Sequence, residues 1–241
     1  MNLLFDDKYA PITKEIGFLE CDIKSVCAAY QLWETEILRQ YKMRIELENV
    51  EGNLESVLRN LLPLTTPIRT RLAFVPTQSA WTAYFDNGPR GTDATGVVKV
   101  LAEKLNCRGI RTVLVPNTMP SKPSKEARGR YGATMLEVYG PDRKPIRIIY
   151  AANDGGRWVF GESGVPFPFE ETARYAAKKI RDKFTGEMLD DYLKHLGIAA
   201  FDETFYVPSN TGSILARKLG KLPDNLREIP LLKIDGNLIL A

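Results

Sequence analysis

The residues best suited to chemistry lie in one polar segment, DNGPRGTD, that follows an aromatic run. Its two carboxylates, Asp86 and Asp93, could hold a divalent metal or serve as an acid and base pair. Arg90 offers a planar fork that suits phosphate or carboxylate. Because the segment leads from a predicted strand into a predicted helix, backbone N–H groups at the helix start could attract an anion. The segment is therefore a candidate binding site.

The same residues also suit a purely structural junction between strand and helix. Asp86 and Asn87 are typical of turns, in which short polar side chains bond the local backbone. Thr92 or Asp93 could cap the helix, and a capping carboxylate would repel an anion. We expect the structural role to dominate and no metal to bind, because no third acidic ligand lies nearby. Asp86, Asn87, Arg90 and Asp93 remain the candidate binding residues.

A second candidate contact region is the aromatic and acidic stretch FDETFY. Aromatic side chains often anchor protein interfaces, and acidic neighbours would suit a basic partner. Phe201, Asp202, Glu203 and Tyr206 are the residues we expect to make such contacts. The alternative is that the stretch places Phe201 and Phe205 in the hydrophobic core.

No catalytic residue or cofactor site is predicted from the remaining motifs. The single histidine, His195, has no nucleophile or orienting acid in a recognisable pattern, and no Walker A or GxSxG motif occurs. The three cysteines, Cys21, Cys27 and Cys107, form no CxxC motif. A zinc site or a disulfide framework is not expected, and a reducing cytoplasm is the simplest location.

Composition points to a globular protein with a nearly balanced surface. The 241 residues include 33 basic and 30 acidic side chains, for a net charge of +3. A dedicated nucleic-acid binder usually has a larger basic excess, so binding through the basic stretch Asn117–Arg130 is the least favoured function. The N-terminus lacks the features of a secretory signal, and no run of about 18 apolar residues predicts a membrane span.

Hydrophobic periodicity predicts an α+β fold with a mixed, mainly antiparallel sheet and helices packed over one face. Strands are expected at Lys14–Asp22, Lys42–Val50, Arg71–Gln78, Ser79–Asn87, Ile110–Pro116, Tyr131–Gly140, Pro145–Asn153 and Arg157–Ser163. Helices are expected at Ile23–Tyr41, Asn53–Leu62, Thr92–Cys107, Pro168–Phe184 and Thr185–Gly197.

We expect residues 1–241 to form one domain, with a two-lobed arrangement as the alternative. Residues Asn117–Arg130 have no apolar period and predict a mobile basic loop. The tail after Ala199 is expected to be irregular, apart from an edge strand at Leu231–Leu240.

Two blocks resemble bacterial cytoplasmic proteins that act as immunity partners of secreted polymorphic toxins. The blocks are Trp81–Gly109 and Phe169–Ile198, with FDETFY following the second. The resemblance implies a small protein that binds a cognate toxin and occludes its site, and it assigns a role to no individual residue. The alternative is an enzyme acting on a phosphorylated or otherwise anionic small substrate, with Asp86, Arg90 and Asp93 at its centre.

Overall fold

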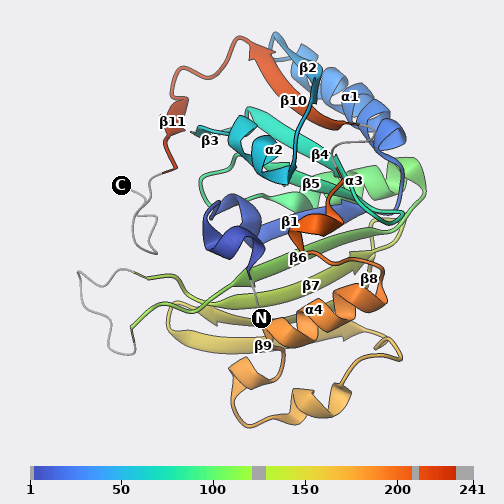
Figure 1. The fold of residues 1–241 in the computed structure, drawn as a ribbon, viewed down its shortest axis with the longest axis vertical. Helices are drawn as coiled ribbons and strands as arrows, with labels where there is room; N and C mark the ends of the chain where they lie inside the picture. Colours follow the sequence, from blue (N-terminus) through green and yellow to red (C-terminus); the bar gives the residue numbers. More distant parts are fainter. Residues whose placement is uncertain (1–2, 121–128, 208–211, 232–241) are drawn as a thin grey trace.

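The computed structural model describes residues 3–120, 129–207 and 212–231. Its main feature is a nine-stranded sheet in which every pairing is antiparallel, in the order β2-β10-β4-β5-β1-β6-β7-β8-β9 (Figure 1). The strands are β1 (Glu15–Leu19), β2 (Met43–Val50), β4 (Arg71–Pro76), β5 (Thr82–Asp86), β6 (Gly109–Val115), β7 (Ala133–Tyr139), β8 (Pro145–Asp154), β9 (Arg157–Gly164) and β10 (Ser213–Gly220). Two short strands, β3 (Leu64–Thr66) and β11 (Arg227–Ile229), pair separately.

The predicted α+β class is confirmed, and the three strands predicted between Tyr131 and Ser163 are present as the antiparallel β7–β8–β9 meander. The C-terminal tail differs from the expected irregular structure, because β10 pairs with β2 on one side and β4 on the other. A late segment of the chain thus completes the part of the sheet that the early strands form. Its sequence, SILARKLG, is short and carries two basic residues, so its alternation is a weak signal of a buried strand.

The helices cover both faces of the sheet, and the expectation that they pack over one face is wrong. They are α1 (Ile23–Arg39), α2 (Leu54–Asn60), α3 (Ala94–Leu105) and α4 (Gly186–His195). Side chains of α1 and α3 share one core cluster with Leu19, whereas those of α2 and α4 share another with Phe18. Successive strand residues point to opposite faces. Strand β5, buried at each of its five positions, shows why both faces need a cover.

Three predicted helix starts are confirmed by side-chain caps. Asp22 accepts a hydrogen bond from the Ser25 N–H at the start of α1, and Asn53 accepts one from the Ser56 N–H at the start of α2. Thr185 caps α4 in the same way. Each cap satisfies a backbone donor that the first turn of a helix leaves free.

The predicted helix at Pro168–Phe184 is wrong. The segment contains two short 3-10 turns, η3 (Thr172–Ala176) and η4 (Ile180–Asp182), with Ala173 and Ala176 exposed. The periodic alanines bury little apolar area, so a continuous helix would gain little from packing. Contacts made by Glu170 and Tyr175 with the sheet and α4 hold the segment instead.

Two predictions fall on parts of the chain that the structure does not describe. Residues 121–128 of the predicted basic loop lie outside the described residues, and so does nearly all of the predicted last strand, from residue 232 onward. At the described end of the loop, Arg130 Nη1 donates to Asp7 Oδ2 at 3.0 Å.

Candidate functional site

The carboxylate of Asp86 is completely buried at the end of β5. Its Oδ1 accepts from the Gly88 N–H at 2.9 Å, while its Oδ2 accepts from the Asp93 N–H at 2.9 Å and from the Tyr84 hydroxyl at 3.1 Å. Burial raises the pKa of Asp86, and the Asp93 N–H and the charge of Arg69 act in the opposite direction. The carboxylate therefore shapes the turn and does not face solvent.

Asn87 is also fully buried, and its amide ties three segments together. Its Oδ1 accepts from the backbone N–H groups of Thr70 at 3.0 Å and Arg71 at 3.2 Å. Its Nδ2 donates to the carbonyl oxygen of Pro63 at 2.8 Å. Because each of these bonds is internal, Asn87 joins the end of β5 to the segment between α2 and β4.

The start of α3 is held by two carboxylates from outside the helix. The Ala94 N–H donates to Glu15 Oε1 of β1 at 2.7 Å, and the Asp93 N–H donates to Asp86. The expectation that Thr92 or Asp93 caps this helix is wrong, because Asp93 makes no side-chain cap and the Thr92 hydroxyl accepts from the Asp86 N–H. Strand β1 packs under α3, which brings Glu15 to the free donors. An anion at this helix start would meet two negative charges.

Arg69, which sequence reasoning did not single out, links the two aspartates of the segment. Its Nη2 donates to Asp93 Oδ2 at 2.9 Å, and its Nε lies 3.6 Å from Asp86 Oδ1. Arg90 and Asp93 are exposed. The structure thus brings Asp86, Asp93 and Arg69 together, with Arg90 at the surface of the same turn.

The FDETFY stretch is partly built into the core. Tyr206 is buried, its hydroxyl donates to the Ala200 carbonyl oxygen at 2.7 Å, and its ring lies 5.9 Å from that of Phe85. Phe201 packs against the same core and is partly buried. Asp202 and Glu203 stay exposed, so they are the members of this group open to a partner.

His195 lies at the end of α4, with about half of its side chain exposed. Its ring stacks on Phe169, with the centroids 4.9 Å apart, and its Nδ1 lies 3.0 Å from the carbonyl oxygen of Asp191. These contacts are typical of a histidine at the C-terminal end of a helix.

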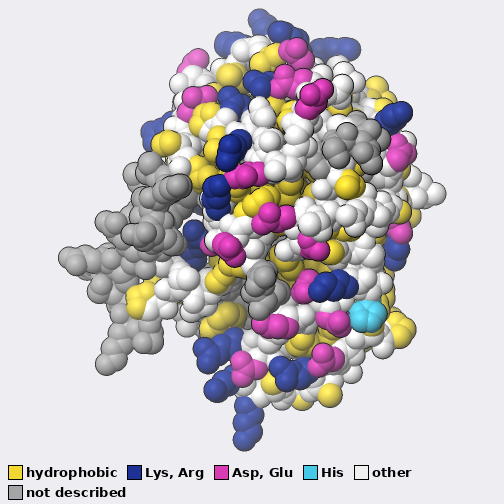
Figure 2. All heavy atoms as spheres, in the orientation of Figure 1, with side chains coloured by type: hydrophobic (Ala, Val, Ile, Leu, Met, Phe, Trp, Pro, Cys, Tyr) yellow, Lys and Arg dark blue, Asp and Glu magenta, His cyan; other side chains and the backbone are white. Residues whose placement is uncertain are grey.

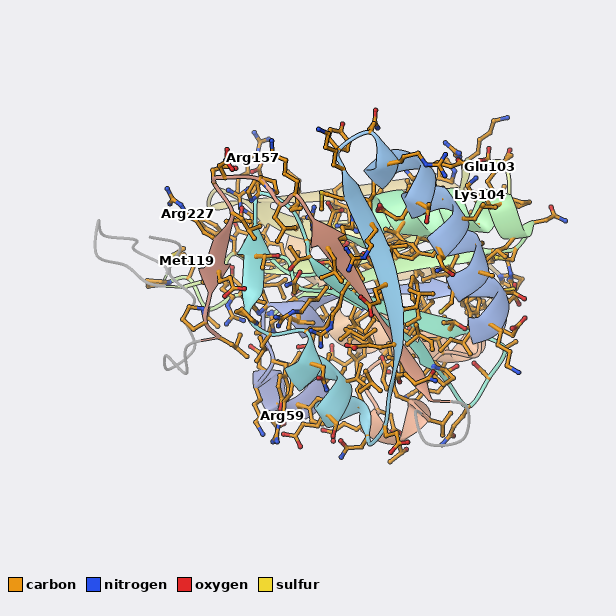
Figure 3. The ribbon with its side chains drawn as sticks, turned by 90° about the horizontal axis from the view of Figure 1, so that it is seen from above. Arg59, Glu103, Lys104, Met119, Arg157 and Arg227 are labelled. Carbon is orange, nitrogen blue, oxygen red and sulfur yellow. The ribbon has the colours of Figure 1, made fainter. Side chains whose placement is uncertain are left out.

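An open pocket of about 710 Å³ lies beside the C-terminal end of α1. Its walls come from α1, the start of β2, the end of β10 and the residues that follow β10. Seen from above, α1 runs alongside β2 with β10 next to it (Figure 3). The apolar part of the lining consists of Ile37, Leu38, Met43, Ile68, Leu222 and Pro223. Its volume is within the range typical of ligand pockets.

The inner wall of this pocket, which we call the α1–β10 pocket, carries a buried ion pair. Lys218 Nζ of β10 donates to Glu34 Oε1 of α1 at 2.8 Å, and the two side chains are 16% and 8% exposed. The other oxygen, Glu34 Oε2, is enclosed and has no hydrogen-bond partner among the described residues. Buried polar atoms without partners are rare in proteins, so Glu34 Oε2 is an unusual feature of the pocket wall.

The rim of the pocket is both aromatic and charged. Tyr41, just beyond α1, is 59% exposed, and Lys42, Lys221 and Asp224 also contribute to the lining. Gly220 is required at this rim because its φ is +107° and a Cβ there would lie 2.6 Å from the Lys42 carbonyl oxygen. The rim is thus fixed by the close approach of β10 to the start of β2.

A row of aromatic rings under α1 lies between the pocket and Asp86. The Tyr30 hydroxyl, one turn before Glu34 on α1, is buried and has no hydrogen-bond partner within the described chain. Burial raises the pKa of Tyr30, and the negative charges of Glu34 and Asp86 act in the same direction. The ring of Phe74 lies between those of Tyr30 and Tyr84, at centroid distances of 5.1 and 5.6 Å. The charges of the buried acids Glu34 and Asp86 therefore both act on the Tyr30 hydroxyl beneath α1.

One signal in the sequence could have revealed Glu34. It follows Tyr30 by four residues and therefore falls on the buried face of α1, where a lone carboxylate needs a partner. That partner, Lys218, is 184 residues away in β10, a strand that the sequence pattern does not predict. For this reason, the sequence alone does not predict that residues of α1 and β10 line one pocket.

The pocket offers polar recognition at its inner wall and apolar contact around it. Within residues 3–120, 129–207 and 212–231, no group of three His, Cys, Asp or Glu side chains is arranged to hold a metal ion. A hydroxyl group at the inner wall would lie beside the Lys218 ammonium, and a small shift of the Glu34 side chain would offer it the carboxylate as an acceptor.

Comparisons with known proteins give no match: no family model fits the chain, and neither the curated proteins nor the solved structures include one that matches it. None of the helices in the described residues is sufficiently long and apolar to cross a membrane. On the face shown in Figure 2, acidic and basic side chains are interspersed.

Proposed function

We propose that the protein functions by binding a protein partner, and that the α1–β10 pocket receives an anchoring side chain of that partner. The observation that carries this proposal is the buried Glu34–Lys218 pair at the inner wall of an open, mainly apolar pocket. Protein interfaces are commonly anchored by one aromatic side chain that fills such a pocket.

The charges of the lining favour a neutral anchor. Lys42, Lys218 and Lys221 are nearly balanced by Glu34 and Asp224. A cationic tip would be repelled by the lysines, and an anionic tip would approach the Glu34 carboxylate. A tyrosine has an apolar ring for the walls and a hydroxyl that both donates and accepts, which suits the pair at the inner wall.

The exposed Tyr41 extends the binding surface beyond the pocket. Tyr41 is one of the few large apolar side chains that the described surface leaves exposed, and it lies at the pocket rim. An aromatic residue beside a concave site adds contact area at a low cost in conformational entropy. Asp202 and Glu203 provide a separate acidic contact for a basic partner.

The resemblance to immunity proteins indicates the class of partner. On this proposal, the protein acts in the bacterial cytoplasm, binds a toxin of its own lineage and occludes the toxin's site. The anionic-substrate enzyme is less well supported, because Asp86 and Asn87 are buried and the donors at the start of α3 are already used.

Co-expression with a toxin gene found directly beside this gene tests the proposal. The protein should protect cells from the toxin, and Tyr41→Ala should reduce binding at least tenfold and weaken protection. Leu32→Ala is the matched control, because Leu32 is 66% exposed on the same helix and does not line the pocket. Equal binding by both variants would contradict the role of the pocket, and no protection by the wild type would contradict the immunity function.

A further inference from the structure

Cys21 and Cys107 lie just beyond the last paired residues of β1 and β6. In the β1–β6 ladder Leu19 pairs with Gly109, and the Glu20 N–H then donates to the Arg108 carbonyl oxygen at 3.0 Å. Extending this register by one step would set Cys21 opposite Cys107. Both backbones turn out of the ladder at this point, with the Cys21 N–H donating to the Leu19 carbonyl oxygen at 2.8 Å and the Cys107 N–H to the Ala102 carbonyl oxygen at 3.0 Å.

The two cysteine side chains also lie on the same face of the sheet. Both pack against the core cluster of α1 and α3, to which Leu19 belongs. The intervening residues, Glu20 and Arg108, form an ion pair at 2.6 Å. The Arg108 guanidinium lies 5.7 Å from the centre of the Trp81 ring, and Trp81 belongs to the core cluster on the opposite face of the sheet. This alternation is what a continued pleat requires.

Opposite residues on one face of an antiparallel pair have Cβ atoms about 4.5–5.5 Å apart, close to the roughly 3.5–4.5 Å that a disulfide spans. Both thiols are partly accessible, whereas Cys27 is buried. Cys21 is also near enough to Cys107 for its charge to act on the Cys107 thiol, so a movement at the two strand ends would bring the sulfurs together.

We propose that Cys21 and Cys107 form a reversible disulfide by exchange with low-molecular-weight disulfides such as oxidised glutathione. The Cys21 thiolate attacks one sulfur of the reagent, which gives a mixed disulfide and releases one glutathione thiol. The Cys107 thiol then loses its proton and attacks the Cys21 sulfur, and the second glutathione leaves as a thiol. The protein loses two electrons and two protons, and one oxidised glutathione becomes two reduced molecules.

The surroundings of Cys107 favour it as the second nucleophile. Burial raises the pKa of the Cys107 thiol to about 11, and the charges of Cys21 and Glu20 act in the same direction, while the Glu20 N–H acts in the opposite one. Such a thiol is a poor first nucleophile in solution but can attack a mixed disulfide held beside it.

The bond would connect the start of α1 with the end of α3. Cys21 immediately precedes the cap of α1, and Cys107 follows Asn106, which ends α3 in a left-handed conformation. The α1–β10 pocket is at the opposite end of α1, so this inference does not depend on the proposed function.

The test is to incubate the native protein with oxidised glutathione, block the remaining thiols with iodoacetamide and map the peptides by mass spectrometry. We expect a Cys21–Cys107 cross-linked peptide, alkylation of Cys27 only after denaturation, and a rise of the thermal midpoint by about 5 °C or more. Dithiothreitol should reverse each change. Cys27→Ser is the matched control and should keep the cross-link, while Cys21→Ser and Cys107→Ser should each lose it.

Two results would overturn the proposal. One is a native protein that carries glutathione on Cys21 or Cys107, or keeps both thiols free, at every ratio of oxidised to reduced glutathione. The other is oxidation that yields only disulfide-linked dimers, since these would show that the two sulfurs meet between molecules and not within one.

Discussion

The carboxylate of Glu15 on β1 caps α3 by accepting a hydrogen bond from the Ala94 N–H at 2.7 Å. The same carboxylate pairs with Arg111 of β6, with Arg111 Nη2 2.7 Å from Glu15 Oε2. One side chain thus connects two neighbouring strands and the helix above them. The start of α3 is therefore fixed by the sheet and not by its own preceding residues.

Glu15→Ala should lower the free energy of unfolding by about 1–3 kcal/mol, because it removes the cap and one of the two carboxylates that pair with the mostly buried Arg111. Asp93→Ala should change it by less than about 1 kcal/mol, since the Asp93 side chain makes no cap and only an exposed ion pair. Urea unfolding of the two variants and the wild type measures the difference. A larger loss in Asp93→Ala than in Glu15→Ala would contradict this assignment.

Glu170→Ala should destabilise the protein by about 3–5 kcal/mol, because it leaves a buried guanidinium without its main partner. Arg147 is 1% exposed and donates to Glu170 at 2.7–3.2 Å, and Tyr175 also donates to Glu170. The neighbouring Glu171→Ala is the matched control, since Glu171 is exposed and should cost less than about 0.5 kcal/mol. Thermal or urea unfolding checks both values, and equal losses would show that Glu170 has no special role.

Glu55 should contribute stability that disappears in acid. Hydrogen bonds from Lys8, Tyr9 and Arg59 lower the pKa of Glu55 to about 2 in the folded protein. The folded state therefore binds this proton less readily than the unfolded state, so the contribution is full above about pH 5 and is lost as the pH falls towards 2. Unfolding of wild type and Glu55→Gln across this range should show a stability difference that shrinks with falling pH. A difference that is constant with pH would contradict the assignment.

Local sequence signals predicted the elements whose partners are close in the chain. The start of α1 at Ile23 and the strands β7, β8 and β9 depend on residues near each other in the chain, so propensity and turn chemistry were sufficient to predict them. The segment Pro168–Phe184 shows the limit of periodicity, because the distant Arg147 and Tyr192 determine its path.

The candidate site required information that a single sequence does not contain. The sequence indicated Asp86, Asn87, Arg90 and Asp93 because their side chains are suited to chemistry. The side chains of Asp86 and Asn87, however, are buried and form hydrogen bonds inside the protein. The Glu34–Lys218 pair joins α1 to β10 across most of the chain, and only the sheet order brings those residues together. The one indication of this ion pair in the local sequence was Glu34 itself, a charged residue on the buried face of α1.

Binding of N-acetyl-tyrosinamide to the α1–β10 pocket tests the central claim most directly. Heteronuclear NMR titration of wild type, Glu34→Gln and Glu36→Gln would locate the probe and give its affinity, with N-acetyl-phenylalaninamide as the probe that lacks the hydroxyl. Glu36 is exposed on the same helix and does not line the pocket, so Glu36→Gln serves as the matched control.

We predict that the tyrosine probe shifts the signals of Ile37, Met43 and Leu222 and binds about tenfold more tightly than the phenylalanine probe, as expected for one hydrogen bond to a charged group. Glu36→Gln should keep this preference. Glu34→Gln should reduce it, because the hydroxyl would then bond a neutral amide in place of a charged carboxylate. Shifts confined to other surfaces, or an unchanged preference in Glu34→Gln, would contradict the account.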